Sequence, residues 1–134
     1  MSGRKYVGAD LSTVIFAPAD AENSIFMTRT SAITKAEALN IGRQFAAKVR
    51  ELIDSEALVF VFGSIIKGKA HIGSDIDIAV VSKKLDGDII REGAKLSSLA
   101  QRISWDIEVH DVALSDWRKG NPHVFEIQRW GIPV

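Results

Sequence analysis

Two short apolar runs constrain the fold of this sequence more than any other feature. Residues 57–62 are wholly apolar, residues 76–81 are apolar apart from one aspartate, and both are rich in β-branched or aromatic side chains. Runs of this kind are typical of strands that are covered on both faces. A chain of 134 residues is long enough for one compact domain with a real core. The two runs therefore predict a sheet at the centre of a single domain.

Helical spacing flanks the two strands. Thr34 and Glu37 have the spacing of a capping box, and apolar residues recur behind them at helical intervals. We therefore expect a helix over residues 34–54. The same spacing returns after a turn at residues 83–87 and predicts a second helix over residues 88–103.

The last part of the chain predicts one more strand and one more helix. Residues 105–114 alternate at first, with Asp106, Glu108 and His110 on one face and apolar side chains on the other. This pattern is typical of a strand with one hydrated or functional side. A final helix is expected over residues 121–131, because a proline stands in its first turn and a glycine at its end.

The order of these elements predicts an α/β (α+β) fold. It consists of a small mixed sheet of three or more strands, flanked by helices in a two-layer domain. The regular patterns cover residues 34–134. Residues 1–33 contain only short β-prone stretches, and we expect them to form an N-terminal arm or a β-hairpin.

The composition argues against several classes of function. Seventeen basic residues balance seventeen acidic ones, so the charge gives no support to a nucleic-acid partner. The sequence contains no cysteine, which excludes disulfides and thiolate catalysis and suits a cytoplasmic protein. The apolar run at residues 14–17 is too short for a signal peptide or a membrane span. We therefore expect a cytoplasmic protein without membrane attachment.

Two acids stand at the start of the second apolar run. Asp75 and Asp77 share a face of the predicted strand, because side chains two residues apart point the same way. Two carboxylates so close repel each other unless a cation lies between them. Mg²⁺ prefers carboxylate and phosphate oxygens, and it would remove this conflict. The alternative is a hydrated acid pair with no ligand.

A second polar feature follows the first apolar run. Gly63 permits a tight turn, and the Ser64 hydroxyl with the backbone N–H groups after it can hold an anion. Lys67 and Lys69 add positive charge nearby. A phosphate-binding turn and a metal-binding acid pair at the ends of neighbouring strands together predict a nucleoside triphosphate site.

This segment resembles the signature of the nucleotidyltransferase superfamily typified by DNA polymerase beta. The signature is Gly-Ser, then ten residues, as residues 65–74 are here, then Asp-x-Asp, often with an inner Gly-x-Ala. The matching positions are Gly63, Ser64, Gly68, Ala70, Ser74, Asp75 and Asp77. The resemblance covers about residues 35–131 and implies the polymerase beta-like fold.

The resemblance also implies a catalytic site. In such a site, two Mg²⁺ ions hold the triphosphate of ATP and activate an acceptor hydroxyl for attack on the α-phosphorus. Metal binding and catalysis fall to Asp75, Asp77 and a third acid on a later strand. Asp106 and Glu108 are the candidates, and Glu108 fits the family's spacing better, although many members have aspartate there. The residues implied to bind the nucleotide are Gly63, Ser64, Lys67, Gly68 and Ser74.

Because the chain has no room for domains that grip nucleic acid, it is similar to the minimal nucleotidyltransferases. These are commonly encoded beside a helical HEPN-type partner protein, and the two act as antitoxin and toxin. The resemblance implies transfer of AMP from ATP to a hydroxyl of that partner. One alternative is a catalytically weak or inactive module that neutralises a helical partner by contact. The other is a transferase for a small molecule such as an antibiotic, which would need a homo-oligomer to complete its pocket.

Overall fold

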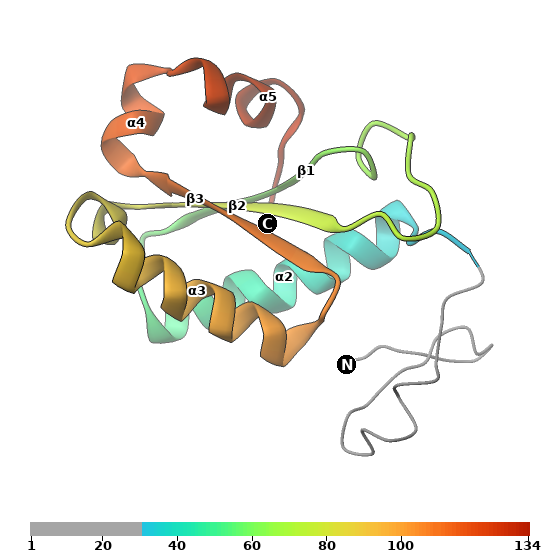
Figure 1. Ribbon diagram of the computed structural model, residues 1–134, viewed down its shortest axis with the longest axis horizontal. Helices are drawn as coiled ribbons and strands as arrows, with labels where there is room; N and C mark the ends of the chain where they lie inside the picture. The colour runs from blue at the N-terminus through green and yellow to red at the C-terminus, as the bar shows by residue number, and fades with distance from the viewer. Residues whose placement is uncertain (1–30) are drawn as a thin grey trace.

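A four-stranded mixed sheet forms the centre of the protein (Figure 1). The structure, a computed structural model, describes residues 31–134, so the predicted N-terminal arm or hairpin lies almost wholly outside the described residues. The strand order is β3-β2-β1-β4, with β1 antiparallel to β2 and β4, and β2 parallel to β3. The strands are β1 Leu58–Phe62, β2 Ile76–Ser82, β3 Ile107–Ala113 and β4 Ile132–Pro133.

Helices cover both faces of this sheet. They are α2 Lys35–Leu52, α3 Ile89–Ile103, α4 Leu114–Lys119 and α5 Pro122–Trp130, with the short 3-10 helix η1 Lys83–Asp86 between β2 and α3. Figure 1 shows α2 and α3 below the sheet and α4 and α5 above it. The domain therefore has three layers rather than the two expected. A third layer is required because the apolar side chains of β2 point to both faces and both must be kept from water.

The packing of β2 shows why both layers are needed. Ile78 and Val80 belong to the larger core cluster, together with Phe45 of α2. Ala79 points the other way and belongs to a second cluster with Val124 of α5. All five side chains are at most 1% exposed. The central strand is thus held from both sides, which fixes the position of the residues at its ends.

The predicted elements are confirmed, with small changes at their ends. The capping box of α2 is present: the Glu37 backbone N–H donates to Thr34 Oγ1 at 3.1 Å, and the Thr34 N–H donates to Glu37 Oε1 at 2.8 Å. The third strand was expected to begin at Trp105 but begins at Ile107, because residues 104–106 form a turn in which the Asp106 N–H donates to the Ser104 hydroxyl at 3.0 Å.

Two elements were not predicted. Helix α4 has six residues, which is too short for a helical period to stand out in a sequence. Strand β4 has two residues, and only its pairing with Phe60 and Val61 of β1 identifies it. The Arg50 guanidinium donates to the Val134 carbonyl at 3.0 Å and helps to hold this C-terminal strand in place.

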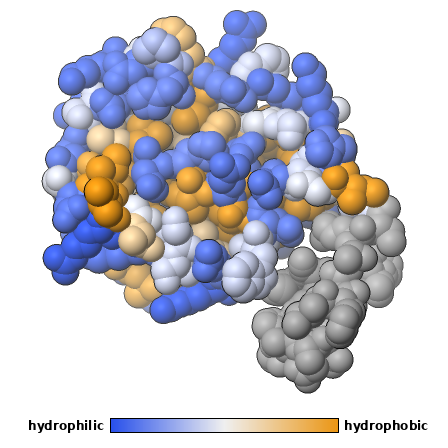
Figure 2. Space-filling view, viewed as in Figure 1, coloured by the Kyte–Doolittle hydropathy of each residue, from blue (hydrophilic) through white to orange (hydrophobic). Residues whose placement is uncertain are grey.

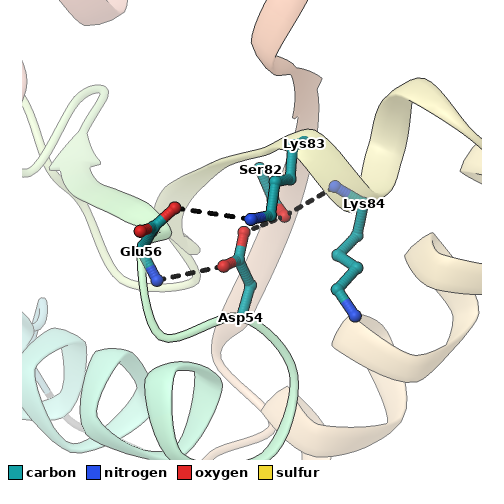
Figure 3. Close-up of polar contacts among 5 residues, drawn as sticks. All are labelled: Asp54, Glu56, Ser82, Lys83 and Lys84. Atoms are coloured by element: carbon teal, nitrogen blue, oxygen red, sulfur yellow. Dashed lines mark hydrogen bonds and ion pairs between the residues drawn. The ribbon is translucent and has the colours of Figure 1, made fainter.

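A buried polar contact ties the start of β1 to the end of β2, at the end of the sheet opposite the Gly-Ser turn (Figure 3). The Ser82 hydroxyl donates to Asp54 Oδ2 at 2.6 Å and accepts from the Lys84 N–H at 3.1 Å. The Glu56 N–H donates to Asp54 Oδ1 at 3.0 Å. Asp54 and Ser82 are 7% and 3% exposed, so water cannot replace either partner easily.

We expect Ser82→Ala to lower the free energy of unfolding by about 1–3 kcal/mol, because it leaves a buried carboxylate with one bond fewer. Urea denaturation measures this loss. Ser97→Ala on the exposed face of α3 is the matched control and should change stability by less than about 0.5 kcal/mol. An equal, small effect of both substitutions would contradict the assigned role of Ser82.

The same contact predicts a pH dependence of stability. Burial by itself raises the pKa of Asp54, but the hydrogen bonds from Ser82 and Glu56 and the charges of Lys83 and Lys84 outweigh it, so the pKa of Asp54 lies below its ordinary value. The resulting stabilisation is present above the unfolded-state pKa of about 3.9 and is lost as the pH falls through the lower folded-state pKa. We therefore expect Asp54→Asn to destabilise the protein at neutral pH and to have little effect at an acidic pH below the folded-state pKa. Denaturation curves at both pH values would show this, and an equal effect at both would contradict it.

Polar side chains break up most of the apolar surface on the face seen in Figure 2. Ile89 and Ile90, at the start of α3, are 46% and 83% exposed.

Within residues 31–134, no helix is long and apolar enough to cross a membrane.

Candidate active site

The strand register brings three polar side chains to one end of the sheet. Asp77 lies opposite Phe62 of the antiparallel strand β1 and opposite Glu108 of the parallel strand β3. His110 comes two residues after Glu108 and pairs with Ala79, so Glu108 and His110 point to the same face of the sheet. This is the face on which α4 and α5 pack farther along the strands. The three side chains therefore share this face of the sheet with the α4 and α5 layer.

Asp77, Glu108 and His110 form a compact group. One ligand atom from each lies within 4.8 Å of the other two. His110 Nε2 is 3.1 Å from Asp77 Oδ1, and the two side chains are 37% and 22% exposed. The imidazole ring meets the Phe62 ring edge to face, with 4.9 Å between their centroids. The group is thus partly shielded but still open to solvent.

Gly63 is the residue that makes room for Asp77. Its φ is +89°, a left-handed conformation that L side chains rarely adopt. A Cβ atom at this position would lie 2.1 Å from Asp77 Oδ2 and 2.9 Å from Asp77 Cγ. Glycine is therefore required here both by the turn and by the carboxylate beside it. This contact brings the Gly-Ser turn and the Asp-x-Asp segment together in space.

The loop after Gly63 contains turns rather than a regular helix. The Lys67 N–H donates to the Gly63 carbonyl at 3.1 Å, and the Lys69 N–H donates to the Ser64 carbonyl at 2.8 Å. Gly68 has a φ of +75° and reverses the chain. These two hydrogen bonds close a single turn over residues 63–69. Ser64 is partly exposed at its start.

Lys67 contacts α5 in this structure. Its ammonium group forms an ion pair with Glu126 at 3.0 Å and lies 5.8 Å from the centre of the Trp130 ring. Trp130 also lies under the Arg129 guanidinium, at 5.6 Å. Lys67, which was predicted to bind phosphate, is therefore paired with an acidic side chain of α5 in this structure.

The other predicted residues lie at the entrance to β2. Ser74 accepts a hydrogen bond from the His71 N–H at 2.9 Å and shapes the end of the loop. Asp75 is exposed and precedes the first residue of β2. It is outside the compact group of Asp77, Glu108 and His110. Asp106, the other candidate for the third acid, is also outside it, and its carbonyl accepts from the Ile76 N–H at 2.7 Å.

Negative charge dominates the electrostatics of the group. The hydrogen bond to Asp77 raises the pKa of the His110 imidazole, burial acts against this, and the charges of Asp77, Glu108 and Asp111 raise it further. Asp111 itself lies on the opposite face of β3, where its carboxylate packs against Gly93 of α3. Burial raises the pKa of Asp111, and the neighbouring His110 acts in the opposite direction.

The compact group fits a divalent metal ion. Two oxygen ligands on opposite sides of a small ion, each at about 2.1 Å, are about 4.2 Å apart. The ligand atoms of Asp77, Glu108 and His110 lie within 4.8 Å of one another, so small side-chain movements would close them around such an ion. Two carboxylates also supply the negative charge that a divalent cation would neutralise.

Comparison with known proteins identifies the family. The family model of the nucleotidyltransferase domain matches residues 43–118, which include the Gly-Ser turn, Asp75, Asp77 and Glu108. The chain belongs to the nucleotidyltransferase domain family. A search of curated protein sequences finds no match. The resemblance seen in the signature residues is therefore confirmed at the level of the family.

A solved structure supports the fold. The chain is similar to a proposed nucleotidyltransferase from Sulfolobus solfataricus, whose crystal structure was determined at 1.40 Å resolution. The TM-score is 0.51 and the sequence identity 18%, over 63% of this chain and 74% of the other. At this identity the likeness shows the shared fold. The family match by itself identifies the protein as an enzyme of the nucleotidyltransferase class.

The structure adds His110 to the site residues that were predicted from the sequence. Its position on the face of Asp106 and Glu108 was visible from strand alternation alone. Its contact with Asp77 was not, because that contact depends on the parallel pairing of β2 with β3. The other two histidines, His71 in the loop and His123 in the first turn of α5, are both exposed.

Proposed function

We propose that this nucleotidyltransferase transfers AMP from ATP to a protein hydroxyl, using divalent metal ions held by Asp77, Glu108 and Asp75. The observation that carries the proposal is the register that sets Glu108 directly beside Asp77, next to the Gly63 turn. A carboxylate pair of this kind beside a phosphate-binding turn suits the transfer of a phosphorus-containing group.

The proposed reaction is an in-line displacement at the α-phosphorus of ATP. The acceptor oxygen forms a bond to that phosphorus, the bond from the phosphorus to the bridging oxygen breaks, and pyrophosphate leaves with that oxygen. Bound Mg²⁺ would neutralise charge on the phosphate oxygens and lower the pKa of the acceptor hydroxyl. Glu108 lies on the open side of β3, where its carboxylate can accept the hydroxyl proton.

The Gly-Ser loop would hold the leaving phosphates. The Ser64 hydroxyl is partly exposed at the start of the turn, and hydroxyl and backbone N–H groups bind phosphate oxygens well. Lys67 would bring positive charge to the same place after exchanging its contact with Glu126 for a phosphate. Gly68 has a positive φ of +75°, a conformation that L side chains rarely adopt, and it lets the loop fold back here.

The proposed acceptor is a helical partner protein of the HEPN type, which the enzyme would neutralise as an antitoxin. The similarity of this chain to minimal nucleotidyltransferases supports this choice. A cytoplasmic location accompanies this proposal.

The position of the radioactive label tests the chemistry. The full chain is incubated with Mg²⁺ and a purified helical protein of the HEPN type, using ATP labelled on the α-phosphate in one reaction and on the γ-phosphate in another. We expect the partner to be labelled only from α-labelled ATP, because AMP transfer retains that phosphorus and releases the other two. Labelling from γ-labelled ATP would show phosphoryl transfer and contradict the proposal.

The second candidate function is neutralisation of a helical partner by contact alone. The exposure of Asp75, away from the compact metal group, favours it, since an incomplete acid set would weaken catalysis. The double substitution Asp75→Asn and Asp77→Asn separates the two functions. If the variant binds and neutralises the partner as well as the unaltered protein does, contact is sufficient and AMP transfer is not required.

A further inference from the structure

His110 lies in the compact group but has no part in the reaction described above. Its Nε2 atom is 3.1 Å from Asp77 Oδ1. Two ligands bound at right angles to one ion, each at about 2.1 Å, are about 3.0 Å apart. The two atoms are thus already at the spacing of neighbouring ligands in an octahedral site. Neither side chain would have to move far for both to bind the same ion.

The surroundings of His110 hold the ring in this orientation. The Phe62 ring packs against it edge to face, with a centroid distance of 4.9 Å and an interplanar angle of 69°. Phe62 is 7% exposed and is itself fixed as the register partner of Asp77. Glu108 completes the group from the same strand, two residues before the histidine. A histidine with only a hydrated surface role would not need this support.

We propose that His110 Nε2 is a direct ligand of the metal ion held by Asp77 and Glu108, and that this nitrogen makes the site prefer first-row transition ions to Mg²⁺. The inference rests on the proposed function only in that it requires a divalent ion at these residues. Mg²⁺ is a hard ion that is served best by oxygen ligands, whereas imidazole is a good ligand for borderline transition ions. An imidazole beside two carboxylates therefore shifts the affinity of the site toward ions such as Co²⁺.

Metal titrations of the full chain without nucleotide test the preference. Visible absorption follows Co²⁺ binding, and competition by Mg²⁺ gives the relative affinity. We expect Co²⁺ to bind at least about tenfold more tightly than Mg²⁺, and His110→Ala to lose about 10–100-fold in Co²⁺ affinity with less than about threefold loss for Mg²⁺. His123→Ala, at an exposed histidine in the first turn of α5, is the matched control and should bind both ions normally.

A second measurement distinguishes a ligand from a residue that only positions Asp77. In the unaltered protein, nuclear magnetic resonance with isotope-labelled histidine and the spin-active isotope of cadmium should show scalar coupling between the ion and His110 Nε2. Such coupling requires a metal–nitrogen bond. Bound cadmium without coupling to His110 would overturn the proposal, as would a His110→Ala variant that keeps its Co²⁺ affinity. The coupling does not depend on how any variant folds.

Neither measurement involves nucleotide transfer. A chain that transfers AMP but binds metal without His110 would overturn this inference and leave the proposed function standing. A chain that binds Co²⁺ through His110 but labels no acceptor would support this inference and contradict the proposed function.

Discussion

Glu108→Gln is expected to reduce nucleotide transfer by about 10²–10⁴-fold, the range attributed to a positioned acid or base, while Asp106→Asn keeps most of the activity. Glu108 lies in register with Asp77 and its carboxylate belongs to the compact group with it. Asp106 precedes β3 and is outside that group. Glutamine keeps the size of the side chain but removes the charge that binds a divalent ion and accepts a proton. The initial rate of transfer of α-labelled AMP measures both effects.

The control for Glu108→Gln is Glu51→Gln, the same change at an exposed position on α2. It should leave the rate unchanged, and thermal unfolding should be similar for all three variants. If Asp106→Asn removes the activity and Glu108→Gln does not, the third acid is Asp106, and the assignment from register is wrong. A loss in both would show that the two acids act together.

Gly63→Ala is expected to abolish transfer as completely as the loss of Asp77 itself. The new methyl group would lie 2.1 Å from Asp77 Oδ2, so the carboxylate has to leave its position in the compact group. The left-handed backbone, with φ of +89°, adds a cost of about 1–2 kcal/mol for any L side chain. We therefore expect a moderate fall in stability together with loss of metal binding. Thermal unfolding would measure the fall in stability, calorimetric titration with Mn²⁺ the loss of metal binding, and the transfer assay the loss of activity.

Gly120→Ala separates the effect of the left-handed backbone from the effect of the contact with Asp77. Gly120 is the C-cap of α4, has a φ of +68°, and has no atom within 4 Å of the position that a Cβ would occupy. It should show the same backbone cost of about 1–2 kcal/mol but keep metal binding and transfer. If Gly63→Ala also keeps them, the contact with Asp77 does not control the site.

Local chemistry made much of this fold predictable. The capping box at Thr34 and Glu37 set the start of α2, and the apolar runs set β1 and β2 within a residue or so. These signals depend on neighbours in sequence, since helix caps and strand alternation are local effects. The layer of α4 and α5 was incompletely predicted, because a six-residue helix shows no period and its place is fixed by packing: Trp117 stacks on Phe60 at 5.0 Å.

The candidate site, like the fold, could be predicted from the sequence only in part. The sequence by itself determined the Gly63 turn and the acid Asp77, because their spacing is a local signature, and it determined that Glu108 and His110 share a strand face. Only the tertiary structure decided which acids meet, since the parallel register of β2 and β3 aligns Asp77 with Glu108 and leaves Asp106 outside the group. Register depends on residues thirty apart in the chain, and alternation within one strand leaves it undetermined. The contact of Gly63 with Asp77 and the bond of His110 to Asp77 follow from that same pairing.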